Sequence, residues 1–202
     1  MKRLNWISGL FATATFVALS AATVQAQPAP DALIKTVATD VTTVLKSDPA
    51  ILSNTAKLKE LIENKLIPNF SFSRMTQLAM GRNWAKASSE QQVALTKEFQ
   101  TLLVRTYSGA LANFRNNTID VRPLRMQPAD TDVTVKTVIN QANGQGIPID
   151  YSLEKEPDGS WKAYDIIVAG VSLVTNYRDE FNTVIRDQGV DALVKQLQSK
   201  NK

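Results

Sequence analysis

The sequence predicts an α+β domain, and three observations carry that prediction. Apolar residues recur at helical spacing through most of residues 31–116, and helical spacing returns after residue 170. Between these parts, residues 119–168 hold alternating or β-rich runs. The runs are separated by turn sequences at residues 128–130, 143–146 and 157–160. Helices, then an antiparallel sheet, then helices is the order of an α+β fold.

Three helices are predicted in the first part, over residues 31–45, 54–66 and 73–80. Asp31 precedes the first apolar run and is the expected N-cap, and Pro49 follows soon after the end of that run. The second helix should stop before Pro68, because the residue before a proline disfavours helical backbone. Gly81 stands where a glycine commonly ends a helix.

The longest predicted helix begins after residue 88 and continues to about Asn116. Its start carries two overlapping capping boxes, Ser88 with Gln91 and Ser89 with Gln92. Its apolar residues from 93 to 114 share one face.

The runs in the middle part predict an antiparallel meander of about four strands. They lie at residues 119–121, 133–135, 147–153 and 161–168. After Gly170 a helix follows with Val174, Tyr177 and Phe181 on one face, and Gly189 should break it. A final helix is predicted over residues 191–198. No internal repeat or long linker divides residues 27–202, so we expect one domain.

The N-terminus has the features of a cleaved signal peptide. Lys2 and Arg3 precede an uncharged, partly apolar stretch that ends in small residues at Val24-Gln25-Ala26. We therefore expect residues 1–26 to be removed and the protein to be exported. An uncleaved membrane anchor is the alternative, but serines and threonines dilute the apolar run.

The composition excludes several classes of chemistry. The chain has no cysteine and no histidine, which rules out Ser-His-Asp triads, thiol nucleophiles and zinc fingers. Loss of Lys2 and Arg3 would lower the formal net charge from +4 to +2, and the basic residues are scattered. We therefore expect no nucleic-acid partner. Asp130 and Asp132 lack the rest of a calcium loop, so no metal site is expected.

Three stretches in order carry a resemblance to a known family. They are residues 67–84, residues 99–107 and residues 161–178, the last with Tyr164-Asp165, Gly170-Val171-Ser172 and Tyr177-Arg178. Together they resemble the MlaC family, also called toluene-tolerance auxiliary proteins. The likeness extends from about residue 31 to residue 197.

The resemblance implies a function as well as a fold. Members of the family are periplasmic carriers whose single α+β domain encloses an apolar cavity for the acyl chains of a glycerophospholipid, with the head group exposed. They shuttle lipid between an outer-membrane lipoprotein complex and the inner-membrane Mla ABC transporter complex. By resemblance we expect a monomer that is neither an enzyme nor an integral membrane protein, with lipid as cargo and no cofactor.

Candidate lipid-binding residues come from the apolar faces of the predicted sheet and helices. Each could equally belong to an ordinary filled core, because any α+β domain needs such residues. Methionine is an adaptable liner, and a tyrosine with a polar tip suits the rim of a lipid pocket. The candidates are Met75, Leu103, Tyr107, Leu111, Val133, Val135, Ile149, Tyr151, Leu153, Ile166, Val168, Leu173, Val174, Tyr177 and Phe181.

Charged candidates are fewer. Arg74, Arg82, Arg105 and Arg178 are candidates for contact with the phosphate head group or with a partner, since guanidinium pairs well with phosphate; ordinary surface arginines are the alternative. Asp165 stands in a strongly apolar strand, where a structural hydrogen bond or a buried pair with an arginine is expected. Two other functions remain open: a periplasmic enzyme using Asp165, and a protein–protein adaptor with a filled core.

Overall fold

The computed structural model describes residues 27–141 and 144–202, so the predicted signal peptide and Asn143 of one predicted turn lie outside the described residues. The α+β class is confirmed. The α-helices are α1 (Pro30–Ser47), α2 (Thr55–Leu61), α3 (Phe72–Met80), α4 (Ser89–Tyr107), α5 (Leu173–Gln188) and α6 (Val190–Lys200). Shorter 3₁₀ or π turns are η1 (Pro49–Ser53), η2 (Ile62–Leu66), η3 (Ile67–Asn69), η4 (Gly81–Lys86) and η5 (Ser108–Phe114). The strands are β1 (Thr118–Val121), β2 (Asp132–Asn140), β3 (Gly146–Lys155), β4 (Trp161–Val168) and β5 (Val171–Ser172).

The strands form one antiparallel sheet in the order β1-β2-β3-β4-β5. The meander was predicted with about four strands, and β5 is a fifth that pairs Val171 with Val168. A strand of two residues is too short to show an alternating pattern in the sequence. The turn before β5 has left-handed backbone at Ala169 (φ 49°) and at Gly170 (φ 85°), a conformation that glycine adopts readily and alanine rarely does.

Two predicted helices change geometry before their predicted ends. The helix expected over residues 54–66 is α-helical only to Leu61 and continues as the π turn η2 and the 3₁₀ turn η3, which includes Pro68. The helix expected to reach Asn116 is α-helical only to Tyr107 and continues as the 3₁₀ segment η5. Apolar spacing alone did not distinguish these turns from an α-helix.

The predicted helix starts are partly right. Ser88 and Gln91 form the predicted capping box at α4, with Ser88 Oγ accepting from Gln91 N at 3.2 Å and Gln91 Oε1 accepting from Ser88 N at 2.8 Å. Asp31 is not the N-cap of α1, because that position is Ala29. Instead, Asp31 Oδ2 accepts a hydrogen bond from Leu124 N at 3.3 Å and ties α1 to the segment after β1.

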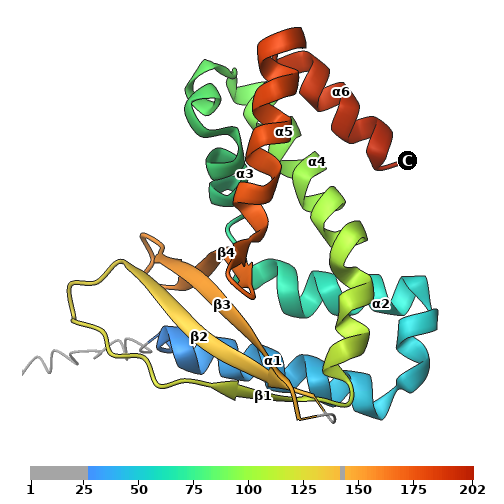
Figure 1. Cartoon of the computed structure of the whole chain (residues 1–202), viewed down its shortest axis with the longest axis vertical. Coiled ribbons are helices and arrows are strands. Elements are labelled where there is room, and N and C mark those ends of the chain that lie inside the picture. Colours follow the sequence, from blue (N-terminus) through green and yellow to red (C-terminus); the bar gives the residue numbers. More distant parts are fainter. Residues whose placement is uncertain (1–26, 142–143) are drawn as a thin grey trace, which may run out of the picture.

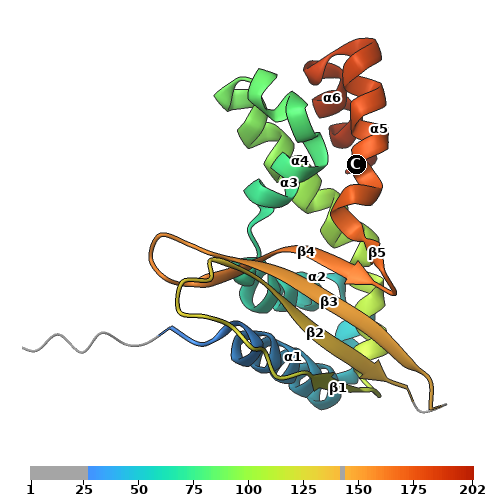
Figure 2. The ribbon, with the colours of Figure 1, turned by 60° about the vertical axis from the view of Figure 1, so that its left-hand side comes forward.

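The helices divide between the two sides of the sheet (Figure 1). Figure 2 shows α1 running beneath the sheet, while α3, α5 and α6 rise above it. Helix α4 begins among the upper helices and descends past the sheet edge toward α1 (Figure 1). Its lower end therefore stands beside the space between α1 and the sheet. Within residues 27–141 and 144–202, no helix is long and apolar enough to cross a membrane.

Three buried clusters support this arrangement. The helical core lies among α3, α4, α5 and α6 and includes Phe99 and Phe181. The sheet core joins Ile34 of α1 to Val135 and other residues of β2, β3 and β4. The third cluster joins α1 to η1, α2, η2 and η5 around Leu45.

Candidate functional site

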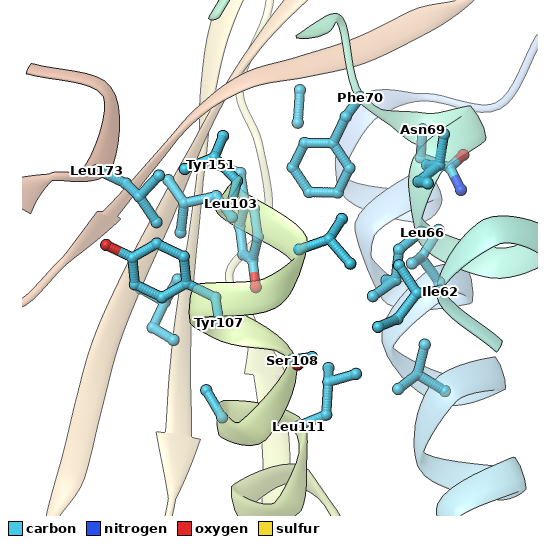
Figure 3. Close-up of a pocket in the computed structure, with 18 of the residues that line it drawn as sticks. Ile62, Leu66, Asn69, Phe70, Leu103, Tyr107, Ser108, Leu111, Tyr151 and Leu173 are labelled. Carbon is cyan, nitrogen blue, oxygen red and sulfur yellow. The ribbon is translucent and has the colours of Figure 1, made fainter. Parts of the chain in front are cut away.

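A cavity of about 240 Å³ lies where these three clusters meet. Its walls come from α1, from η2 and η3, from the lower end of α4 with η5, and from one face of β3 and β4. Figure 3 shows Leu111 of η5 facing Ile62 and Leu66 of η2, whereas the ring of Tyr107 on α4 points toward Leu173. Phe70 and Tyr151 also enter the same space (Figure 3). Segments distant in the sequence thus surround one hollow.

The cavity wall is apolar and uncharged. The polar side chains among its described lining residues are those of Asn69, Tyr107, Ser108 and Tyr151. No described lining residue carries a charged side chain. Such a wall offers few hydrogen-bond partners to water, so the space suits a hydrocarbon better than water. Each methylene removed from water into this space gains about 0.8 kcal/mol. The chemistry of the site is therefore burial of apolar groups.

Two tyrosines keep their hydroxyl groups neutral beside the cavity. Burial raises the pKa of Tyr151 to about 12, so this residue adds no negative charge to the wall near neutral pH. Burial, together with a hydrogen bond with Tyr107, raises the pKa of Tyr177 to about 12. Tyr177 thereby helps to position Tyr107, which lines the cavity and is 37% exposed.

Much of the helical wall is not α-helical. The π turn η2 contributes Ile62 and Leu66, the 3₁₀ turn η3 contributes Asn69, and η5 contributes Ser108 and Leu111 among others. Such turns have hydrogen-bond geometry different from that of an α-helix and often occur at functional sites. Because they alter which side chains share a face, sequence reasoning identified Leu111 of η5 as a candidate but none of the residues of η2 and η3.

Nine predicted lipid-binding residues line the cavity. Their side chains meet from α3, α4, η5, β3, β4 and the start of α5. They are Met75, Leu103, Tyr107, Leu111, Ile149, Tyr151, Ile166, Val168 and Leu173.

Three predicted residues lie on the correct face of the sheet but outside the cavity wall. Val133 faces Leu153, and Val135 faces Tyr151, across β2 and β3. Val133, Val135 and Leu153 belong to the sheet core, which the N-terminal part of α1 fills through Ile34. The filled end and the hollow end of this face have the same alternation in sequence, so alternation could not separate them.

Three predicted residues of α5 also lie outside the cavity wall. Val174, Tyr177 and Phe181 face the helical core. The rings of Tyr177 and Phe181 each lie 5.1 Å from the ring of Phe99, in edge-on arrangements. Leu173, at the first position of α5, is the residue of this helix that reaches the cavity.

Residues of α1 and of the segment before α3 were missed as candidates. Helix α1 contributes Ile34, Val37, Ala38 and Val41, the segment before α3 contributes Phe70, and the first residue of α3, Phe72, also lines the cavity. The helical spacing of the α1 residues was visible in the sequence and predicted a buried face. The spacing gave no indication that this buried face borders a cavity.

None of the four predicted arginines lines the cavity. Arg105 lies on α4, and its Nη1 donates to the carbonyl oxygen of Lys200 at 3.3 Å. Arg74, Arg82 and Arg178 instead line one groove between α3 and α5.

Asp165 has the structural role expected for it. Its Oδ1 accepts hydrogen bonds from Ile166 N at 2.9 Å and Val174 N at 3.1 Å, and its Oδ2 accepts from Ser172 Oγ at 2.5 Å. Ser172 Oγ in turn accepts from Thr175 N at 3.0 Å and caps α5. Asp165 therefore fastens β4 to the start of α5, and it does not line the cavity.

Comparison with known proteins identifies the family. The family model described as "MlaC protein" matches residues 35–199. The chain belongs to the MlaC family. Among solved structures, it is similar to a phospholipid-binding protein from Ralstonia solanacearum in complex with a phospholipid, with 42% identity and a TM-score of 0.77. That similarity covers 85% of this chain and 96% of the Ralstonia chain.

Two curated relatives agree with this MlaC assignment. The intermembrane phospholipid transport system binding protein MlaC of Haemophilus influenzae is 25% identical over 95% of this chain and 87% of its own length. The toluene tolerance protein ttg2D of Pseudomonas putida is 29% identical over 52% of this chain and 48% of its own length.

Proposed function

We propose that this MlaC-family chain is a periplasmic phospholipid carrier that buries acyl chains in the cavity and leaves the head group exposed. In this role it shuttles glycerophospholipid between an outer-membrane lipoprotein complex and the inner-membrane Mla ABC transporter complex. The observation that carries the proposal is the uncharged, apolar cavity. A similar structure, 42% identical, holds a phospholipid, which supports this function.

The energetics of a carrier explain why the cavity must be apolar. A two-chain lipid has on the order of 30 methylenes at about 0.8 kcal/mol each, so free passage through water costs on the order of 20 kcal/mol. A carrier that buries the chains as well as a membrane does makes transfer nearly balanced. The direction of transport then depends on the partner complexes and the ATP cycle of the transporter.

The exposed parts of the cavity wall support a position for the head group in the proposed complex. Tyr107 is 37% exposed and Val168 is 40% exposed, although both residues line the cavity. We assign them to the mouth, with the acyl chains against Ile149, Tyr151 and Ile166. An adaptor with a filled core does not account for this hollow.

Native mass spectrometry tests the proposal on protein purified from the periplasm of a Gram-negative host. We expect two-chain phospholipid bound to the folded protein, and chemical analysis of the extract should identify its head groups and chains. Recovery of ligand-free protein alone, even after incubation with phospholipid vesicles, would contradict the proposal.

Two variants of α1 provide a matched control. Ala38→Phe adds a ring at the cavity wall and should lower the fraction of protein that carries lipid. Ala32→Phe makes the same change at an exposed position of the same helix and should leave that fraction unchanged. Equal lipid content in both variants would contradict the proposal that this cavity binds the acyl chains.

A further inference from the structure

A second hollow lies on the other side of α3 from the cavity. It is a groove of about 1340 Å³ between α3 with η4 and α5 with the start of α6, and we call it the basic groove. Its basic lining residues are Arg74, Arg82, Lys86, Arg178 and Arg186. The basic groove and the cavity share no lining residue. Phe72 and Met75 of α3 line the cavity, whereas the basic groove is lined by other residues of that helix.

The basic groove is strongly one-sided in charge. Its described lining residues include five cations and no carboxylate, although the whole chain has 23 basic and 19 acidic residues. Arg74 pairs with Glu154 at 3.3 Å and Arg186 pairs with Asp187 at 2.8 Å, and neither acid lines the groove. Arg82, Lys86 and Arg178 form no ion pair with any residue that the structure describes.

The walls of the basic groove are joined by hydrogen bonds. Arg178 Nε of α5 donates to the carbonyl oxygen of Leu78 in α3 at 3.1 Å. Asn83 Nδ2 of η4 donates to Asn182 Oδ1 of α5 at 2.9 Å. These bonds hold the two walls at a set separation, so a ligand meets a preformed surface and loses less free energy to ordering.

The basic side chains of the groove differ in exposure, and this difference favours a narrow ligand. Arg82, Lys86 and Arg186 are exposed, whereas Arg74 and Arg178 are half-buried. A flat anionic bilayer would meet the exposed cations first, but a single polypeptide segment is narrow enough to reach the deeper ones as well. The volume of the groove also exceeds what a single small anion would occupy.

The groove also offers apolar contacts between its charges. Leu78, Ile185 and Val190 are half-buried and line it. We propose that the basic groove binds an acidic polypeptide segment of a partner protein, with apolar side chains placed between the carboxylates. Carboxylates would pair with the guanidinium groups, and the apolar side chains would contact the three aliphatic residues. This docking site goes beyond the carrier function and leaves the cavity free.

A labelled peptide tests this proposal on the full mature protein. The probe is a short peptide of glutamates with interspersed leucines, and its control has every glutamate replaced by glutamine. Fluorescence anisotropy should show binding of the glutamate peptide alone, and the affinity should fall as salt is added. Equal binding of the two peptides would overturn the proposal.

Charge reversal in the protein provides the second arm. Arg82→Glu combined with Lys86→Glu should weaken binding of the glutamate peptide by at least about tenfold, because two charge-assisted contacts become repulsive. Lys97→Glu combined with Lys195→Glu makes the same change in net charge at exposed sites outside the groove. An equal loss in both double variants would mean that only net charge matters, and it would overturn the assignment to the groove.

Two further measurements separate this proposal from its competitors. Sedimentation with phosphatidylglycerol vesicles tests a membrane as the ligand: groove-dependent binding to vesicles without peptide binding would overturn the polypeptide assignment. Lipid content of the groove variants, measured by native mass spectrometry, should equal that of the wild type. Because peptide binding does not need bound lipid, failure of the carrier function would leave the peptide result intact.

Discussion

The helical core and the cavity are built from the same kinds of residue, yet one is filled and the other is hollow. In the helical core, Phe99 and Phe181 are 0% exposed and their rings lie 5.1 Å apart. Around the cavity, leucines, valines and aromatic residues surround about 240 Å³ of space. The difference is therefore in geometry and not in composition.

The backbone explains much of this difference. The helical core is made mainly by residues of the regular α-helices α3, α4, α5 and α6, whose side chains can interdigitate to the density of a crystal. The cavity has π and 3₁₀ turns in its helical wall at η2, η3 and η5. In this chain the hollow is therefore bordered by helical segments that depart from the α-helix, whereas the helical core lies mainly among regular α-helices.

Phe181→Ala should have the largest effect on stability. It removes a ring from the filled region, and the loss of contacts with the cavity left behind costs about 3–5 kcal/mol in the free energy of unfolding. Lipid content per folded molecule should not change, because Phe181 does not line the cavity. Urea denaturation and native mass spectrometry measure the two quantities. A loss below about 1 kcal/mol would show that the helical core is looser than described.

A pair of tryptophan variants on one face of the sheet sharpens the comparison. Val135 is 0% exposed in the sheet core, so Val135→Trp should destabilise the protein by about 1–3 kcal/mol or more through overpacking. Ile166→Trp can extend into the cavity, so it should lower lipid content at a smaller cost in stability. Thermal unfolding and native mass spectrometry of both variants give the result. If Val135→Trp left the stability unchanged and lowered the lipid content, the cavity would have to extend further along the sheet.

Asp165→Asn tests the connection between the two regions. The amide keeps the shape but cannot accept all the hydrogen bonds from Ile166, Ser172 and Val174, so a loss of about 1–3 kcal/mol is expected. Asp179→Asn, at an exposed position of α5, is the matched control and should have little effect. A periplasmic enzyme using Asp165 would instead lose turnover while keeping its stability.

The smallest expected effect on stability comes from the ionisation of Tyr151 at alkaline pH. Its pKa is about 12 in the folded protein and 10.0 ordinarily, so the unfolded chain loses the proton first as pH rises. The contribution to stability is unchanged below about pH 10 and declines between about pH 10 and 12. Tyr151→Phe should therefore show a smaller fall in Tm between pH 9 and pH 11 than the wild type. An identical fall in both would mean that Tyr151 is ionised as easily in the folded state.

The fold was predictable because it depends on local patterns. The capping box at Ser88, the strand alternation and the break at Gly189 each follow from a few neighbouring residues. The cavity was predictable only in part, through residues such as Tyr151 and Leu103. Whether Val135 or Ile149 borders a space depends on where the first turns of α1 lie against the sheet, and no local pattern encodes that contact. The grouping of Arg74, Arg82 and Arg178 likewise depends on the packing of α3 against α5.

The turns in the cavity wall have a consequence for the rate of lipid exchange. Backbone hydrogen bonds in 3₁₀ segments are less well aligned than those of an α-helix, so such segments open at a lower free-energy cost. The wall residues contributed by the 3₁₀ segments η3 and η5 can therefore separate while the helical core stays closed. Amide hydrogens of η3 and η5 should exchange with solvent faster than those of α4 between Leu95 and Leu103. The slowest step of lipid release would then be local and would not require unfolding of the domain.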